Sequence, residues 1–407
     1  MKLTWAAILT LLVGVAALPL LGTVWVIPMA LASHDPRLVG TSLVGAGLVL
    51  SAVAVRRHPR GRRARNVLVV MASVAILLVG MTFGAAPYRL EDVEFTNAPA
   101  TLSGTLVLPS RGSRHPAVVL MHGSGPEDRG LSFLFAERFA RAGVAALIYD
   151  KRGSGSSTGG SPRDPYSDLS HDALAAVDRL RIHPAIDSDR IGLWGLSEGG
   201  WTAPLAASMA GDTIAFIVIV SGAGASTQQE NLFSIRTQLE DAGIDAAGVD
   251  RALGLRRQID DYYRTGIGLA EVQAEIGDAE ATDWFRAAGA YLPPSSEVYT
   301  YGSDAWRAHL QFLEFDALPL LRDLEMPMLF IHGSEDRSFP SELSAARLQE
   351  LDDDPSRDVT VVTFEGADHA IMARLLPWPE YADGYLELMV DWVATRVGTD
   401  ALPAEPS

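Results

Sequence analysis

The sequence has 407 residues, a net charge of −17 and no cysteine, yet its mean hydropathy is positive, at +0.14. Both values follow from segregation along the chain: residues 1–87 carry eight basic side chains and one acidic one, a net +7, and the remainder carries 25 basic and 49 acidic ones, a net −24. This composition excludes a disordered protein, a small disulfide-stapled secreted protein and a main domain that binds nucleic acid. The class of protein that remains is one with a membrane segment joined to an acidic globular domain.

Three apolar runs without ionisable side chains lie in the first 87 residues, at about 5–32, 38–55 and 67–86. An apolar helix of about 20 residues crosses the hydrocarbon core of a bilayer. We therefore predict three transmembrane helices and a membrane region over residues 1–87, with the lipid bilayer as a binding partner.

The loop between the second and third apolar runs contains six arginines, from Arg56 to Arg65. Short basic loops stay cytoplasmic, so the residues after Pro87 should lie outside the cytoplasm in a multi-pass protein of the cell membrane. An alternative takes Ala30–Ala32 as a signal-peptidase site, and it places the globular domain on the same side of the membrane.

After Tyr88, short β-branched runs alternate with amphipathic stretches, which is typical of an α/β domain with a mainly parallel sheet. The segment 100–106 indicates an antiparallel strand pair at the sheet edge. The predicted strands are Asp92–Phe95, Leu102–Leu108, Ala117–Met121, Ala145–Tyr149, Arg190–Trp194, Ala215–Val220, Met328–Ile331 and Val359–Phe364. The most evident helices are Asp168–Arg181, Gly199–Met209, Ser341–Leu351 and Glu380–Val397.

One long interval, residues 224–321, has few strand-like runs and reads as acidic amphipathic helix rich in aromatic side chains. A structureless loop of this length is improbable inside a compact domain. We therefore predict a helical lid over 224–321, inserted into an α/β core formed by 88–223 and 322–407. Most of the aromatic side chains of the lid should form its own core.

The motif Gly195-Leu196-Ser197-Glu198-Gly199 follows an apolar strand and precedes a helix. A serine at such a sharp turn needs a strained backbone, and Gly195 and Gly199 allow the strand and the helix to approach each other. The serine hydroxyl then projects above the sheet, which predicts that Ser197 is a nucleophile.

A nucleophilic serine needs a base, and the base needs an orienting acid. With a motif of this kind the acid follows the serine in the chain and the histidine comes last. Of His309, His332 and His369, only His369 lies in a loop after a predicted core strand, at a position from which it can reach the serine. The acid is Asp336, at the end of the preceding strand, with Glu335 as the alternative.

An oxyanion hole is expected from the segment His122-Gly123-Ser124-Gly125, which ends another buried strand. The backbone N–H groups of Ser124 and Glu198 would be its two donors. The residues leave open which amide of 123–125 takes this role. His122 reads as a brace for the turn.

These segments, together with Tyr149-Asp150-Lys151-Arg152-Gly153, resemble the α/β-hydrolase superfamily over about residues 90–397. Within it they resemble a bacterial subgroup of lid-bearing esterases, similar to dienelactone-hydrolase-like proteins and to the C-terminal domain of acyl-CoA thioesterases. The resemblance implies an α/β-hydrolase fold and hydrolysis of a small-molecule carboxylic ester through an acyl-enzyme. It implies no metal and no cofactor.

The leading hypothesis is thus a membrane-anchored serine hydrolase with a Ser197–His369–Asp336 triad. A serine peptidase of the same fold is the alternative, in which Glu230, Glu240 or Asp241 would bind a peptide amino terminus. Hydrolysis of coenzyme A thioesters is disfavoured if the domain lies outside the cytoplasm. A non-catalytic receptor or scaffold would not need all three triad residues, and three helices without an intramembrane charge give a transporter no polar pathway. The sequence does not indicate an oligomeric state.

Overall fold

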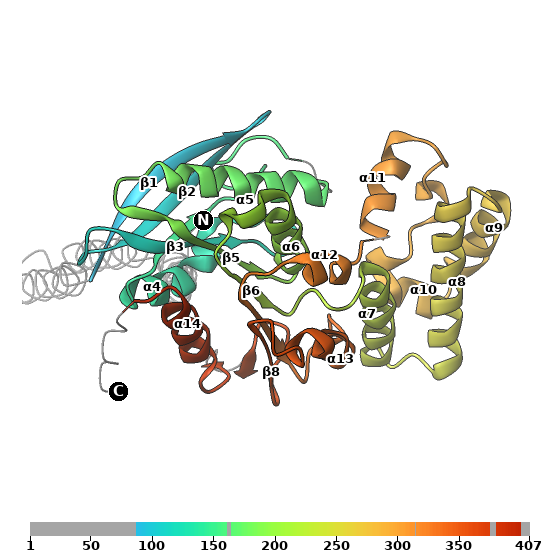
Figure 1. Ribbon diagram of the computed structural model, residues 1–407. Coiled ribbons are helices and arrows are strands. Elements are labelled where there is room, and N and C mark those ends of the chain that lie inside the picture. Colours follow the sequence, from blue (N-terminus) through green and yellow to red (C-terminus); the bar gives the residue numbers. More distant parts are fainter. Residues whose placement is uncertain (1–86, 161–163, 314, 375–379, 400–407) are drawn as a thin grey trace, which may run out of the picture.

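The computed structural model describes residues 87–160, 164–313, 315–374 and 380–399. Its centre is an eight-stranded sheet in the order β1-β2-β4-β3-β5-β6-β7-β8 (Figure 1). The β1–β2 and β2–β4 pairs are antiparallel and the other pairs are parallel. The strands are β1 (Tyr88–Asn97), β2 (Ala100–Pro109), β3 (His115–Met121), β4 (Ala145–Tyr149), β5 (Ile186–Leu196), β6 (Ile217–Val220), β7 (Met328–Gly333) and β8 (Val359–Phe364).

Each of these eight strands lies where the sequence predicts one, and β4 and β8 have the predicted bounds. The β1–β2 pair confirms the antiparallel hairpin at the sheet edge, with Asn97 opposite Ala100 at its turn. The inner strands are buried on both faces, because the side chain of Val119 packs in one core and those of Val118 and Leu120 in another. This explains why they read as continuous apolar runs.

Helices cover both faces of the sheet (Figure 1). One face packs against α5 (Tyr166–Arg181), α6 (Gly199–Ala210), α12 (Leu318–Asp323) and α13 (Ser341–Asp352). The other face packs against α4 (Phe133–Arg141) and α14 (Tyr385–Arg396). Short 3₁₀ turns lie at Arg129–Ser132, Gly211–Thr213, Gly289–Tyr291 and Ser295–Glu297.

The prediction of a continuous helix over Glu380–Val397 is wrong at its start. Residues Glu380–Tyr381 form β10, which pairs with β9 (Met372–Arg374), and α14 begins only at Tyr385. The reason is Gly384, whose φ of +81° places the helix N-cap in the left-handed region.

The segment between β6 and β7 is helical, and we refer to residues 224–321 as the lid. It contains α7 (Thr227–Asp241), α8 (Ala246–Thr265), α9 (Leu269–Ala279), α10 (Asp283–Ala288) and α11 (Asp304–Leu313), which stand to one side of the sheet in Figure 1. These helices enclose a hydrophobic core of their own that includes Tyr262, Tyr263 and Trp284. By contrast, Phe312 and Phe315 pack against the main core beside the sheet, and Tyr301 is exposed.

The three transmembrane helices predicted at about 5–32, 38–55 and 67–86 fall outside the described residues. Within the described part of the chain, no helix combines the length and the apolar character needed to cross a bilayer.

Candidate active site

A sharp turn joins β5 to α6 at Ser197. This serine has a φ of +55°, a left-handed conformation that residues other than glycine rarely adopt. Hydrogen bonds fix the turn: Ser197 N donates to Val220 O at 2.9 Å, and Gly200 N donates to Ser197 O at 2.7 Å. Strain of this kind persists only where the surrounding structure enforces it, and it concentrates at functional sites.

Glycines let the strand and the helix meet at this turn. A Cβ atom on Gly195 would lie 2.2 Å from Gly199 O, and one on Gly200 would lie 2.6 Å from Gly222 Cα. At Gly199 the closest approach would be 3.1 Å, to His122 O. Gly195 and Gly200 are therefore the stricter requirements, and Gly200 lies one residue beyond the predicted motif.

The structure places His369 beside Asp336. The distance from His369 Nδ1 to Asp336 Oδ2 is 2.7 Å, and the Asp336 side chain is fully buried whereas that of His369 is 28% exposed. Asp336 Oδ1 accepts hydrogen bonds from Ser338 N and Phe339 N. A carboxylate oxygen accepts hydrogen bonds, so His369 Nδ1 is the donor in this contact. Glu335, the alternative acid, is exposed.

The same edge of the sheet carries Ser197, Asp336 and His369, because β5, β7 and β8 are parallel and each residue follows the carboxyl end of its strand. The loop that holds His369 packs tightly on β7: a Cβ atom on Gly333 would lie 2.3 Å from Ala367 O. No hydrogen bond between Ser197 and His369 is present among the described residues. The structure therefore joins Asp336 and His369 directly and brings Ser197 to the same edge of the sheet.

The other two histidines after Ser197 have different surroundings. His332 is fully buried, stacks on Phe339 at a ring distance of 5.9 Å, and burial lowers its pKa to about 4. His309 packs between the rings of Tyr263 and Tyr299 in the lid. His332 thus lies in the core beside Phe339, and His309 lies in the core of the lid.

The loop after β3 lies next to Ser197. A Cβ atom on Gly123 would be 3.7 Å from Ser197 Cβ, and Gly123 N is already engaged with Glu127 Oε2 at 3.1 Å. In the described part of the chain, the backbone N–H groups of Ser124 and Glu198 donate to no protein acceptor. These are the two donors expected for an oxyanion hole.

Lys151, two residues after β4, connects this loop to the turn at Ser197. Its Nζ forms a salt bridge with Glu198 and donates to Gly123 O at 2.7 Å. Burial raises the pKa of Glu198 and of Glu127, and the charge of Lys151 offsets part of both shifts. Neither Lys151 nor Glu127 was expected at this site from the sequence. The available signal in the sequence was a lysine two residues after a buried strand.

Other residues singled out near the site are structural. His122 Nε2 bonds to Tyr149 O, and burial lowers the pKa of His122 to about 4, so the ring is neutral and braces the turn as expected. Asp150 binds Arg129, and Arg152 forms a buried pair with Asp172. Across the described residues, no group of three or more His, Cys, Asp or Glu side chains is placed to hold a metal ion.

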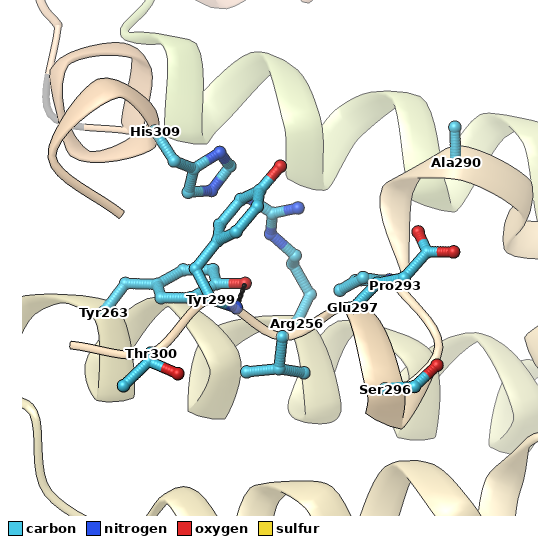
Figure 2. A pocket seen from close by; sticks show the side chains of 10 residues that line it. Arg256, Tyr263, Ala290, Pro293, Ser296, Glu297, Tyr299, Thr300 and His309 are labelled. Carbon is cyan, nitrogen blue, oxygen red and sulfur yellow. Dashed lines mark hydrogen bonds between the residues drawn. The ribbon is translucent and has the colours of Figure 1, made fainter. Parts of the chain in front are cut away.

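A cavity of about 400 Å³ lies inside the lid, away from these residues. Figure 2 shows His309, Tyr263, Tyr299 and Arg256 at one end of it and Glu297 at the other. Neither Ser197 nor the Asp336–His369 pair lines this cavity.

Comparison with known proteins identifies the family. The model of the alpha/beta hydrolase family matches residues 118–384, more than half of the chain. This chain belongs to the alpha/beta hydrolase family. The membership confirms the resemblance and the fold expected from the sequence, and it supports a hydrolase.

Curated relatives of this alpha/beta hydrolase match shorter segments of the chain than the family model does. The quorum-quenching protein AidA of Acinetobacter baumannii (strain MDR-ZJ06) is 35% identical over 125 residues, which are 30% of this chain and 40% of AidA. The thiohydrolase aneE of Aspergillus aculeatus is 37% identical over 116 residues, 28% of this chain and 35% of aneE. The chain thus spans less than half the length of these curated relatives. Among solved structures, Est1E from Butyrivibrio proteoclasticus with bound ferulic acid has a TM-score of 0.46 at 19% identity, over 74% of this chain and 96% of that one.

The role of Gly195 is testable by substitution. Gly195→Ala forces a Cβ atom against the Gly199 carbonyl, so we expect a loss of about 1–3 kcal/mol in the free energy of unfolding. Gly254→Ala, in the middle of α8, is the matched control, because a Cβ atom there meets nothing within 4 Å and should stabilise the helix by about 0.5–1 kcal/mol. Thermal unfolding of both variants gives the comparison. A Gly195→Ala protein as stable as wild type would contradict the close approach.

Proposed function

We propose that this alpha/beta hydrolase is a serine hydrolase that cleaves carboxylic esters through an acyl-enzyme. The observation that carries the proposal is the 2.7 Å pair between His369 Nδ1 and the buried Asp336 carboxylate, at the sheet edge that also carries Ser197 in its strained turn. Acyl transfer needs a nucleophile, an orienting acid and a base, and Ser197, Asp336 and His369 follow one another in this chain order.

In the proposed mechanism, Ser197 Oγ attacks the ester carbonyl while His369 Nε2 takes the hydroxyl proton. The N–H groups of Ser124 and Glu198 would stabilise the oxyanion of the tetrahedral intermediate. Collapse breaks the bond to the alcohol, which leaves with the proton from His369. Water, activated by the same imidazole, then hydrolyses the acyl-enzyme. Asp336 holds the ring in the required tautomer and stabilises the imidazolium.

The names of the relatives do not decide whether the substrate is an oxygen ester or a thioester. One is named a thiohydrolase, and a thioester would enter the same steps with a thiolate as leaving group. A peptidase is the second candidate within the mechanism. A non-catalytic scaffold is disfavoured, because it would have no use for a buried carboxylate held against a histidine.

We further propose that residues 1–87 anchor the enzyme in the cell membrane as three transmembrane helices, with the hydrolase domain outside the cytoplasm. The support is the three apolar runs and the arginine-rich loop between the second and the third. The acidity of the domain that follows favours a soluble surface with little affinity for anionic lipid headgroups.

Turnover by a nucleophile variant tests the reaction. In a panel of p-nitrophenyl esters and peptide p-nitroanilides, Ser197→Ala should lose roughly 10⁶-fold in kcat, because the base and acid act only through the serine. Ser208→Ala, an exposed serine on α6, should retain full turnover. Undiminished ester hydrolysis by Ser197→Ala would overturn the mechanism, and cleavage of peptides in preference to esters would favour the peptidase.

The identity of the acid is tested separately. Asp336→Asn should lower kcat by about 10⁴-fold, because an amide no longer fixes the Nδ1–H tautomer of His369. Glu335→Gln, one residue away and exposed, should leave kcat unchanged. The reverse pattern, with Glu335→Gln inactive and Asp336→Asn active, would show that the assignment of the acid is wrong.

The proposed topology predicts access from outside the cell. Protease added to intact cells or spheroplasts should digest the domain after residue 88, while a cytoplasmic marker protein survives. Full protection of the domain until the cells are lysed would place it in the cytoplasm.

A further inference from the structure

Glu230 lies in the first turn of α7, where it is half-buried. The polar residues that precede it in the chain all have partners. Ser226 and Gln229 form a capping box, and Gln229 also accepts a hydrogen bond from Arg347 at 2.9 Å. Thr227 donates to Phe312 O, and Gln228 donates to Asp260 at 3.0 Å. The Glu230 carboxylate, by contrast, has no hydrogen bond or ion pair with any described residue. It is therefore a carboxylate held in place by its helix and left without a partner.

The face of α7 that carries Glu230 packs against the loop that carries Asp336. Residues 230, 234, 237 and 241 follow one another at helical spacing and so share a face. Ser234 Oγ donates to Ser338 O at 2.7 Å, and Thr237 Oγ1 donates to Arg337 O at 2.6 Å. These two hydrogen bonds hold α7 of the lid against the segment directly after Asp336. Glu230 lies on the same face of α7, one turn before Ser234.

Two acidic residues of the proposed active site, Asp336 and Glu198, affect the pKa of Glu230. Burial, and then the negative charges of Asp336 and Glu198, raise the pKa of Glu230 to about 8. Tyr166, at the start of α5, faces the same group: burial and the charges of Glu198 and Glu230 raise its pKa. Tyr166 also borders a hollow of about 570 Å³ between α5 and α11. The cations described around these residues already have partners: Lys151 binds Glu198 and Gly123 O, Arg347 binds Gln229 and Asp316, and Arg307, which lines the hollow, pairs with Asp304.

An unpaired carboxylate among like charges is costly in a folded protein, and such groups concentrate at sites that bind a ligand or react. A positively charged ligand group would remove this cost. The other two acids of α7 considered for such a role differ from Glu230, because both are exposed and lie near a cation: Asp241 pairs with Arg337, and Glu240 lies 3.8 Å from the same guanidinium.

We propose that Glu230 is a specificity-determining residue that binds a cationic group of the substrate, so that the enzyme prefers esters that carry an ammonium group. This inference rests on the proposed esterase function, since it assigns a substrate class to the same site. The lid then contributes to substrate choice through α7, and its docking on the Asp336 loop fixes the distance between the cation site and the serine.

The test compares substrates that differ only in charge. One pair has the charge in the leaving group: acetylthiocholine and its carbon isostere S-(3,3-dimethylbutyl) thioacetate. The other has it in the acyl chain: p-nitrophenyl 4-(trimethylammonio)butanoate and p-nitrophenyl 5,5-dimethylhexanoate. Thiol release is measured without background, because the chain contains no cysteine. The ratio of kcat/KM for charged over neutral substrate is internal to each protein, so a loss of folded enzyme cancels.

For wild type we expect a ratio of about tenfold or more in at least one pair, and a fall to about unity in Glu230→Gln. The wild-type ratio should rise between pH 7 and pH 9, because Glu230 is mainly protonated below its raised pKa and charged above it; the variant should lack this rise. Glu275→Gln, an exposed position on α9, removes the same charge and should keep the wild-type ratio.

Equal ratios in wild type and Glu230→Gln, or no preference for either charged substrate, would overturn the cation site while leaving the esterase intact. If wild type hydrolyses neither member of either pair, the proposed function fails and the cation site with it.

Discussion

The left-handed turn at Ser197 is the constraint on which the rest of the site depends. A serine at a φ of +55° costs of order 1–3 kcal/mol, and the cost is met by the parallel strands and the helix on either side. Gly195 and Gly200 allow the close approach of β5, α6 and residue 222, and Ser197 N is held by Val220 O on the neighbouring strand. As a result, the backbone at Ser197 is held by both neighbouring elements.

The remaining parts are arranged around this turn by the sheet. Parallel strands deliver their following loops to one edge, so Gly123, Asp336 and His369 reach it from β3, β7 and β8. Lys151 connects the loop after β3 to Glu198, and α7 connects the lid to the loop after β7. Hydrogen bonds therefore hold the loops on both sides of Ser197, and α7 of the lid contacts the residues directly after Asp336.

Much of this organisation was predictable from the sequence, because local patterns determine it. The strands at Ala145–Tyr149 and Val359–Phe364 are apolar or β-branched runs with abrupt ends, and the motif around Ser197 carries its own turn chemistry. The start of α14 was not predictable from periodicity, since residues 380–384 continue the pattern until Gly384 interrupts it. The roles of Lys151 and Glu127 were not predictable either, because they depend on contacts between loops that are distant in the chain. For Glu230, the sequence offers three acidic candidates on one helix, and only the docking of α7 separates them.

A covalent adduct would show whether Ser197 is the activated nucleophile. The purified protein is treated with a fluorophosphonate and digested, and the modified residue is identified by tandem mass spectrometry. We expect a single adduct on Ser197, formed at a rate that falls sharply when His369 is replaced by Ala. An adduct on another serine, or continued ester turnover with Ser197 unmodified, would contradict this assignment.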